Sequence, residues 1–158
     1  MNWNPKDVDM FLQAKEYVDT AVIPLLPVSL GKRARETAVM GEFTAALAAE
    51  VEREYKGRIL HMPPFTYLSS EGREELMSRL KAWEGETHAE DVSHIFYITA
   101  DGMWKSMEDE LAGDLIWVPS VDLGSIEGAA ARQLLTGQAA QLQQLIRDTW
   151  KEKETSSN

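Results

Sequence analysis

The stretch Thr20–Leu30 constrains the fold of this chain most, because it is apolar along nearly its whole length. It reads Thr-Ala-Val-Ile-Pro-Leu-Leu-Pro-Val-Ser-Leu, without alternation of apolar and polar residues. Such a run is typical of a strand that helices cover on both faces. The basic segment Lys32–Arg35 and an amphipathic run at 36–55 follow it. Strand, loop and helix in this order form the repeating unit of an open α/β domain.

Three further apolar segments alternate with helical patterns along the chain. Helices between successive strands imply crossover connections, which give parallel pairing. We therefore predict an α/β fold: a three-layer αβα domain with a four-stranded, mainly parallel sheet of flavodoxin- or Rossmann-like type, in the order 2-1-3-4. The other predicted strands are 58–62, 94–99 and 114–118, and the predicted helices are 5–18, 36–55, 71–84, a short segment at 104–111, and a last helix ending near Lys151.

Prolines limit the predicted strands. Pro24 and Pro27 cannot donate to a ladder, so we expect regular pairing of the first strand to end near Ile23 or Leu25. The stretch 63–68, Pro-Pro-Phe-Thr-Tyr-Leu, then reads as an aromatic loop that leads to a helix capped by Ser70. Aromatic side chains and prolines at a strand end either line a groove for a small molecule or peptide, or close the end of the core.

The last helix is long for the predicted sheet. Capped by Asp122 or Ser125, it would contain roughly 26 residues and extend about 39 Å, more than a four-stranded sheet covers. Either Gly128 and Gly137 bend or shorten it, or one end projects and presents an apolar stripe to a partner; packing of the stripe in the core is the alternative. We place the single domain at 1–151 and a disordered polar tail at 152–158. The candidate interface residues are Leu142, Leu145, Ile146 and Trp150.

Composition excludes several classes of function. Twenty-six acidic residues against 16 basic ones give a net charge of −10, which repels phosphate backbones and disfavours nucleic acid as a partner. There are no cysteines, so disulfides and thiolate chemistry are excluded. We expect no export signal at Met1–Pro5, and no apolar run reaches the ~20 residues of a membrane span. The expected location is the cytoplasm, without membrane insertion.

A small anionic ligand is one candidate partner. In open α/β sheets, ligands bind beyond the carboxyl ends of the strands, where the strand order reverses. With the order 2-1-3-4, the loops 25–35 and 100–105 meet at that point. Bases that lead into a helix N-terminus can bind an anion, although a solvated basic loop explains them as well. The candidate ligand-binding residues are Ser29, Lys32, Arg33, Arg35, Asp101, Trp104 and Lys105.

Catalytic and metal-binding patterns are absent from the sequence. The three histidines, His61, His88 and His94, show no metal-ligand spacing. The loop before the second helix has one glycine, Gly31, and lacks the phosphate-binding fingerprints. A Gly-x-Ser-x-Gly elbow is also missing. We therefore predict no metal and no cofactor, no catalytic residue, and a protein that is less readily explained as an enzyme than as a binding domain.

The chain resembles the YpiF-type family of small, uncharacterised bacterial proteins. The similarity rests on Trp3–Asp7, on Gln13–Pro27 with its Val-Ile-Pro-Leu-Leu-Pro, and on Ile98–Gly102, which reads Ile-Thr-Ala-Asp-Gly. The resemblance implies no established activity, cofactor or catalytic residue. It implies a genomic association with a quinol–cytochrome c reductase, and so a respiratory or assembly context.

The layout is weakly similar to that of the creatininase-type amidohydrolases. Val22–Pro27, Ile59–Tyr67 and Ile95–Gly102 follow one another as comparable segments do in those enzymes. Their Glu-x-His-Gly and Asn-x-His-Gly-Gly-Asn metal motifs are replaced here by Val-Ser-Leu-Gly-Lys at 28–32 and Thr-Ala-Asp-Gly-Met at 99–103. This resemblance implies an architecture and argues against the activity.

Two hypotheses for function follow. The leading one is a non-catalytic, cytoplasmic interaction or accessory domain that binds a protein partner or a second copy of itself through the last helix. The alternative is a binder of, or an enzyme acting on, a small anionic ligand in the crevice between the first and third strands.

Overall fold

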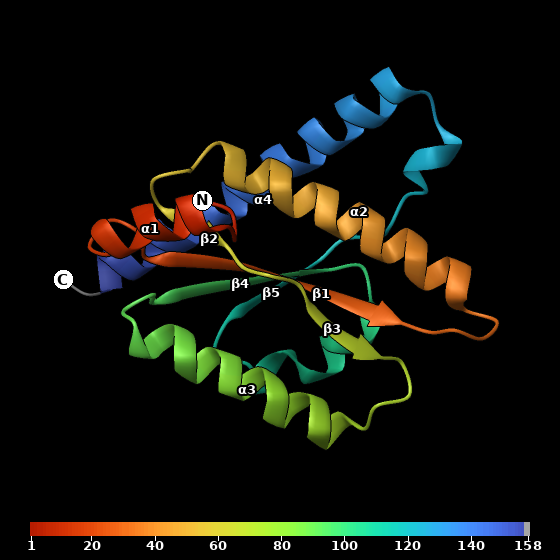
Figure 1. Ribbon diagram of the computed structural model, residues 1–158, viewed down its shortest axis with the longest axis horizontal. Helices are drawn as coiled ribbons and strands as arrows, with labels where there is room; N and C mark the ends of the chain where they lie inside the picture. Colours follow the sequence, from red (N-terminus) through yellow and green to blue (C-terminus); the bar gives the residue numbers. More distant parts are fainter. Residues whose placement is uncertain (157–158) are drawn as a thin grey trace.

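Five parallel strands form one sheet between two layers of helices in the computed structural model, which describes residues 1–156 (Figure 1). This confirms the predicted three-layer α/β architecture with crossover connections. In chain order the elements are α1 (Pro5–Gln13), β1 (Thr20–Val28), α2 (Ala34–Arg53), β2 (Ile59–His61), β3 (Phe65–Leu68), α3 (Arg73–Ala89), β4 (His94–Thr99), the 3-10 helix η1 (Gly102–Glu110), β5 (Asp114–Trp117), the 3-10 helix η2 (Leu123–Ser125) and α4 (Gly128–Ser156).

The strands lie in the order β2–β1–β4–β5, and β3 pairs with β1 further along the same edge as β2. The predicted order 2-1-3-4 is therefore correct, with β4 and β5 as its third and fourth strands. The prediction of an aromatic loop at 65–68 is wrong, because this segment pairs with β1 from Leu25↔Phe65 to Val28↔Leu68. The following helix begins at Arg73 rather than after Ser70.

β1 continues to Val28, so the predicted end of pairing near Ile23 or Leu25 is also wrong. Backbone groups of alternate residues in a strand point to opposite sides, and the Leu25 carbonyl accepts from Thr99 of β4. Pro24 therefore faces the other side, at the gap between β2 and β3. Pro27 faces the side of β4 beyond its last paired residue. Neither proline needs to donate a ladder hydrogen bond at its position.

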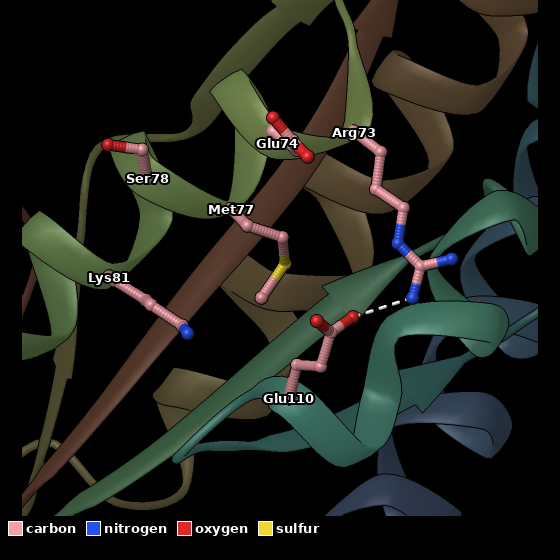
Figure 2. Close-up of a pocket in the computed structure, with 6 residues that line it drawn as sticks. All are labelled: Arg73, Glu74, Met77, Ser78, Lys81 and Glu110. Carbon is pink, nitrogen blue, oxygen red and sulfur yellow. Dashed lines mark hydrogen bonds and ion pairs between the residues drawn. The ribbon is translucent and has the colours of Figure 1, made fainter.

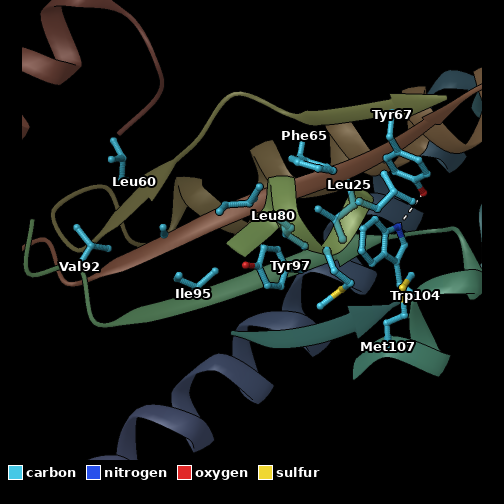
Figure 3. Packing of buried hydrophobic residues seen from close by; sticks show 14 of the residues in the cluster. Leu25, Leu60, Phe65, Tyr67, Leu80, Val92, Ile95, Tyr97, Trp104 and Met107 are labelled. Carbon is cyan, nitrogen blue, oxygen red and sulfur yellow. Dashed lines mark hydrogen bonds between the residues drawn. The ribbon is translucent and has the colours of Figure 1, made fainter. Parts of the chain in front are cut away.

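Two apolar cores hold the layers together. On one face of the sheet, α3, η1 and α1 pack around a core that contains Tyr97 and Trp104; on the other face, α2 and α4 pack around Phe43 and Ile146. Figure 3 shows the first core, in which aromatic side chains from β3, β4 and η1 lie close together. Removal of these large apolar side chains from water provides the main driving force for the fold.

A close contact and a buried acid fix the position of α3 against the sheet. Glu84 of α3 is 6% exposed and accepts hydrogen bonds from the Tyr97 hydroxyl (2.7 Å) and the Gly113 N–H (2.9 Å). A Cβ atom at Gly113 would lie only 2.8 Å from the Tyr97 ring and 2.9 Å from Ile95. Glycine is therefore required where the chain enters β5.

α4 differs from its predicted form at both ends. It begins at Gly128, so neither predicted cap lies at its start. Asp122 instead precedes the 3-10 helix η2, and Ser125 is the last residue of η2. The helix continues to Ser156 rather than ending near Lys151. Residues 152–156 of the predicted polar tail therefore lie in α4, and residues 157–158 lie outside the described part of the chain. The end that projects from the molecule is the N-terminal one (Figure 1).

Candidate functional site

The two loops of the predicted anion site lie at the same edge of the sheet, because they follow the adjacent parallel strands β1 and β4. Their charges interact across the gap. Glu36, its neighbour on α2, raises the pKa of Arg33 most, and Asp101 and Tyr67 on the facing side add to the shift. The sequence thus predicted the proximity of these loops correctly.

Trp104, however, does not face that crevice. It is fully buried, and its indole N–H donates to the Tyr67 hydroxyl (2.8 Å) (Figure 3). The Tyr67 hydroxyl in turn donates to Asp101 (2.6 Å). Burial, and then Asp101, raise the pKa of Tyr67 far above its usual range. The other Asp101 oxygen accepts from the Met103 N–H at the start of η1 (3.0 Å). This chain of hydrogen bonds anchors η1 to β3, and Trp104 serves the core because its indole N–H finds a partner there.

The basic residues of the predicted site are mostly engaged elsewhere. Ser29 lines a separate apolar groove beside α2, and Lys32 has no hydrogen bond or ion pair among the described residues. Arg35 lines a different hollow, together with Glu42 and Asp122. The remaining bases have these neighbours: Arg33 with Glu36 (2.9 Å), Arg35 with Asp122 (2.5 Å), and Lys105 over the Trp117 ring (3.6 Å).

A cleft of about 600 Å³ between α3 and η1 carries mixed charges (Figure 2). Arg73 in this cleft forms an ion pair with Glu110 (2.6 Å) and donates to the Ser106 carbonyl (3.2 Å). Its charge is therefore compensated within the protein, and the pair joins α3 to η1. Met77 lies at the base of the cleft and belongs to the core.

An apolar groove beside the C-terminal half of α3 has a different character. We call it the Trp3 groove. It has a volume of about 400 Å³ and is continuous in its lining with a smaller cavity of about 120 Å³ beneath it. The groove is lined by Trp3, Met62, Pro63, Ala82, Trp83, Glu86 and Thr87, and the smaller cavity adds Phe11, Ala21, Leu60, Glu90 and Val92.

Local structure explains why this groove is open. Asn4 caps α1 by accepting from the Asp7 N–H (2.8 Å), so the preceding Trp3 leaves the helix and reaches α3. Met62 and Pro63 lie in the interruption between β2 and β3, where no strand covers the sheet edge. Trp83 packs edge-on against the buried ring of Phe65 (5.5 Å between centroids). Trp3 is 53% exposed.

The rim of the Trp3 groove is acidic. Glu86 lines both the groove and the cavity beneath it and has no hydrogen bond or ion pair among the residues described. Glu90 forms an exposed ion pair with Lys15 (2.5 Å). His61, close by on β2, contacts Asn2 (3.1 Å), and burial lowers its pKa, which favours the neutral ring. An apolar floor beside an uncompensated carboxyl group favours a ligand that is apolar and basic.

The predicted interface on α4 is largely buried. Leu142, Ile146 and Trp150 pack in the core between α4, α2 and the sheet, and Leu145 is the exposed member at 51%. The Trp150 N–H donates to the Thr20 hydroxyl (2.9 Å) at the start of β1. Of the two alternatives for this stripe, an open face and packing in the core, the structure shows packing in the core for Leu142, Ile146 and Trp150, because the C-terminal half of α4 packs on the sheet.

The histidines lie in separate places, with His61 in β2 and His94 at the start of β4. Within residues 1–156 no three His, Asp or Glu side chains converge in a way that could hold a metal ion. The same described residues contain no helix that is both long enough and apolar enough to cross a bilayer.

Comparison with known proteins places the chain in a family. A family model described as "Protein of unknown function (DUF2487)" matches residues 9–150. The chain belongs to this family. It is also 35% identical over 150 residues to the uncharacterised protein YpiF of Bacillus subtilis (strain 168), an alignment that covers 95% of this chain and 98% of that protein. No solved structure gives a significant match. The predicted YpiF-type resemblance is confirmed, whereas the creatininase-type likeness finds no support in these comparisons.

Only part of the Trp3 groove could be inferred from the sequence. Pro63–Tyr67 was expected to line a groove or to close the core, and it does both. Pro63 lines the groove, while Phe65 and Tyr67 are buried. Trp3 carried a usable signal, because a large aromatic residue just before a helix cap lies outside the apolar stripe of that helix. Its position next to α3 depends on tertiary structure.

Proposed function

We propose that this member of the family is a non-catalytic, cytoplasmic accessory domain that binds a protein partner through the Trp3 groove. The observation that carries the proposal is the apolar groove between Trp3 and Trp83, whose rim holds the unpaired carboxyl group of Glu86. Trp3, Met62, Pro63 and Trp83 form one contiguous apolar lining with a polar rim, and such surfaces are characteristic of interaction sites.

The groove defines the chemistry of its partner. Tryptophan is among the residues that contribute most to protein interfaces, above all where it adjoins a pocket that a partner side chain can fill. The cavity beneath Trp3 offers such a pocket for one large apolar side chain. Glu86 on the rim, together with the net charge of −10, attracts lysine or arginine. The expected partner is a peptide segment or helix with an apolar anchor and basic flanking residues.

The alternative, binding of a small anionic ligand at the β1 and β4 loops, has weaker support. Arg33 and Arg35 are neutralised by Glu36 and Asp122, and Trp104 is buried. A net charge of −10 also opposes the approach of an anion.

Site-specific photocrosslinking in the native cell tests the proposal. A photoreactive phenylalanine analogue replaces Ala82, an exposed residue of the Trp3 groove, and in a control it replaces Leu145, an exposed residue of α4. A discrete crosslinked protein is expected from position 82 and not from position 145. Equal products from both positions, or none from position 82, would contradict the proposal.

Binding of the identified partner is then measured by calorimetry with purified proteins. Trp3→Ala is expected to weaken binding at least about 30-fold, which corresponds to the loss of roughly 2 kcal/mol expected at an interface hot spot. Glu86→Lys is expected to weaken binding most at low salt. A charge on the rim acts mainly by attracting or repelling the charged partner during association, and salt screens this effect. Leu145→Ala serves as the matched control and should bind as the wild type does.

A further inference from the structure

The exposed edge of β3 is closed by two side chains of the same chain. Residues Phe65 and Tyr67 point their backbone groups toward β1, so Thr66 and Leu68 point theirs outward, as the neighbouring Ser69 N–H bond to β1 shows. The Leu68 N–H donates to Glu71 (2.7 Å), and the Thr66 carbonyl accepts from Arg79 (3.0 Å).

Glu71 and Arg79 also bind each other, at 2.6 Å. Together they imitate a neighbouring strand: the carboxyl oxygen takes the place of a strand carbonyl, and the guanidinium takes the place of a strand N–H. Arg79 lies in addition over the Phe65 ring (4.6 Å), which holds it against the edge. We call this pair the edge clamp.

The rest of this sheet edge, outside β3, cannot pair with a strand of another molecule. The His61 N–H of β2 donates to the Met1 carbonyl (2.7 Å), so the N-terminal residue occupies that part. Pro63 and Pro64 lack donors altogether. Of the two edge strands on this side, β3 is therefore the one whose outward Leu68 N–H and Thr66 carbonyl become free once the two side chains move away, whereas the Leu68 carbonyl keeps its bond from the Glu71 N–H (3.0 Å).

We infer that the β3 edge is a latent site of self-association, and that the edge clamp keeps the chain monomeric. A second copy is the occupant that fits, because β3 placed antiparallel to its own copy offers the same outward donors and acceptors across a two-fold axis. Exposed edges with apolar residues favour such pairing. Leu68 on β3 is 53% exposed, and Leu30 nearby lines the adjoining apolar groove and is 91% exposed.

The edge clamp can cover the β3 edge and still be displaced from it. Its two side chains are partly exposed, at 21% for Glu71 and 45% for Arg79, so the ion pair itself adds little stability. Its effect lies in occupying the donor and the acceptor that a second copy would need. This inference is independent of the Trp3 groove.

Light scattering after size exclusion tests it with three variants. The double variant Glu71→Ala/Arg79→Ala is expected to form a dimer at least tenfold more tightly than the wild type, which should stay monomeric. The matched control is Arg73→Ala/Glu110→Ala, which removes another exposed α3 ion pair but leaves the β3 edge covered. It should stay monomeric. The third variant adds Leu68→Lys to the clampless protein and should restore the monomer, because a lysine on an edge strand opposes pairing.

Circular dichroism and amide hydrogen exchange complete the test. A clampless protein that keeps the wild-type spectrum yet remains monomeric at millimolar concentration would overturn the inference, as would association that Leu68→Lys leaves unchanged. If the Glu71→Ala/Arg79→Ala variant is unfolded, the Glu71→Gln variant tests the inference instead. It weakens the clamp but keeps an acceptor, and it must then show intermediate association and faster exchange of the Leu68 amide. A wild type that already pairs through β3 would also refute it.

Discussion

Replacing Glu84 by leucine is expected to destabilise the protein by about 2–6 kcal/mol, because two buried donors lose their shared acceptor. Oε2 of Glu84 accepts from the Tyr97 hydroxyl and from the Gly113 N–H, and all three groups are buried. Each donor left unpaired in the core costs about 1–3 kcal/mol. Burial, and then Glu84, raise the pKa of Tyr97 above its usual range, so its hydroxyl is protonated and can donate at neutral pH.

A double-mutant cycle with Tyr97→Phe separates the pair from its surroundings. Tyr97→Phe removes one donor and leaves Glu84 bonded to Gly113, so it should cost less than Glu84→Leu. In the double variant one unpaired donor is gone, and we expect a coupling energy of about 1–3 kcal/mol. Glu84→Gln is the matched control, since its amide oxygen still accepts.

The free energies come from urea unfolding followed by tryptophan fluorescence and circular dichroism, with linear extrapolation to water. The reasoning would be refuted by a Glu84→Leu variant within about 0.5 kcal/mol of the wild type at an unchanged denaturant slope. Strict additivity in the cycle would equally show that the Tyr97 hydroxyl and Glu84 do not depend on each other.

Two further predictions concern stability. Gly113→Ala should lower the free energy of unfolding by about 1–3 kcal/mol, because its Cβ would overlap Tyr97. Gly85→Ala in α3, where a Cβ meets nothing within 4 Å, should raise it by up to about 1 kcal/mol. Thermal melting compares the two variants, and equal shifts of the melting temperature would contradict the packing argument. Burial lowers the pKa of His94, so the unfolded chain binds the proton first and the free energy of unfolding should fall as the pH drops below about 6.5. Urea unfolding from pH 8 to 5 should show a smaller fall for His94→Gln, and a pH dependence equal to that of the wild type would exclude this role. Burial also lowers the pKa of His61, which therefore contributes with the same sign.

The sheet order could be predicted because apolar runs separated by helices leave few topologies. The extent of β1 could not. Pro24 looks incompatible with pairing until its neighbours are known, and the structure places it opposite the gap between β2 and β3. The residues Phe-Thr-Tyr at 65–67 are aromatic and β-branched types that favour a strand, and the structure buries Phe65 and Tyr67 while it exposes Thr66 and Leu68. This preference was outweighed by the two prolines before it.

The candidate site was harder to predict than the fold. A tryptophan in a loop, such as Trp104, reads equally as a ligand contact or a core residue, and its hydrogen bond to Tyr67 decides for the core. The spacing of the apolar residues in α4 predicts a helix but does not indicate which end of that helix projects from the molecule. Trp150 lies at the packed end because the Thr20 hydroxyl accepts its N–H there.

The interruption between β2 and β3 explains why the surface of interest lies away from the usual crevice of α/β domains. In such domains ligands bind at the carboxyl ends of the strands, yet here those ends are taken up by the hydrogen bonds of Asp101 and by ion pairs of the nearby arginines. Where Met62–Pro64 breaks the edge strand, the sheet leaves apolar side chains uncovered between Trp3 and α3. The same break isolates β3 as a short edge that Glu71 and Arg79 can close. One proline-rich interruption therefore accounts both for the groove that we assign to a partner and for the edge that needs a clamp.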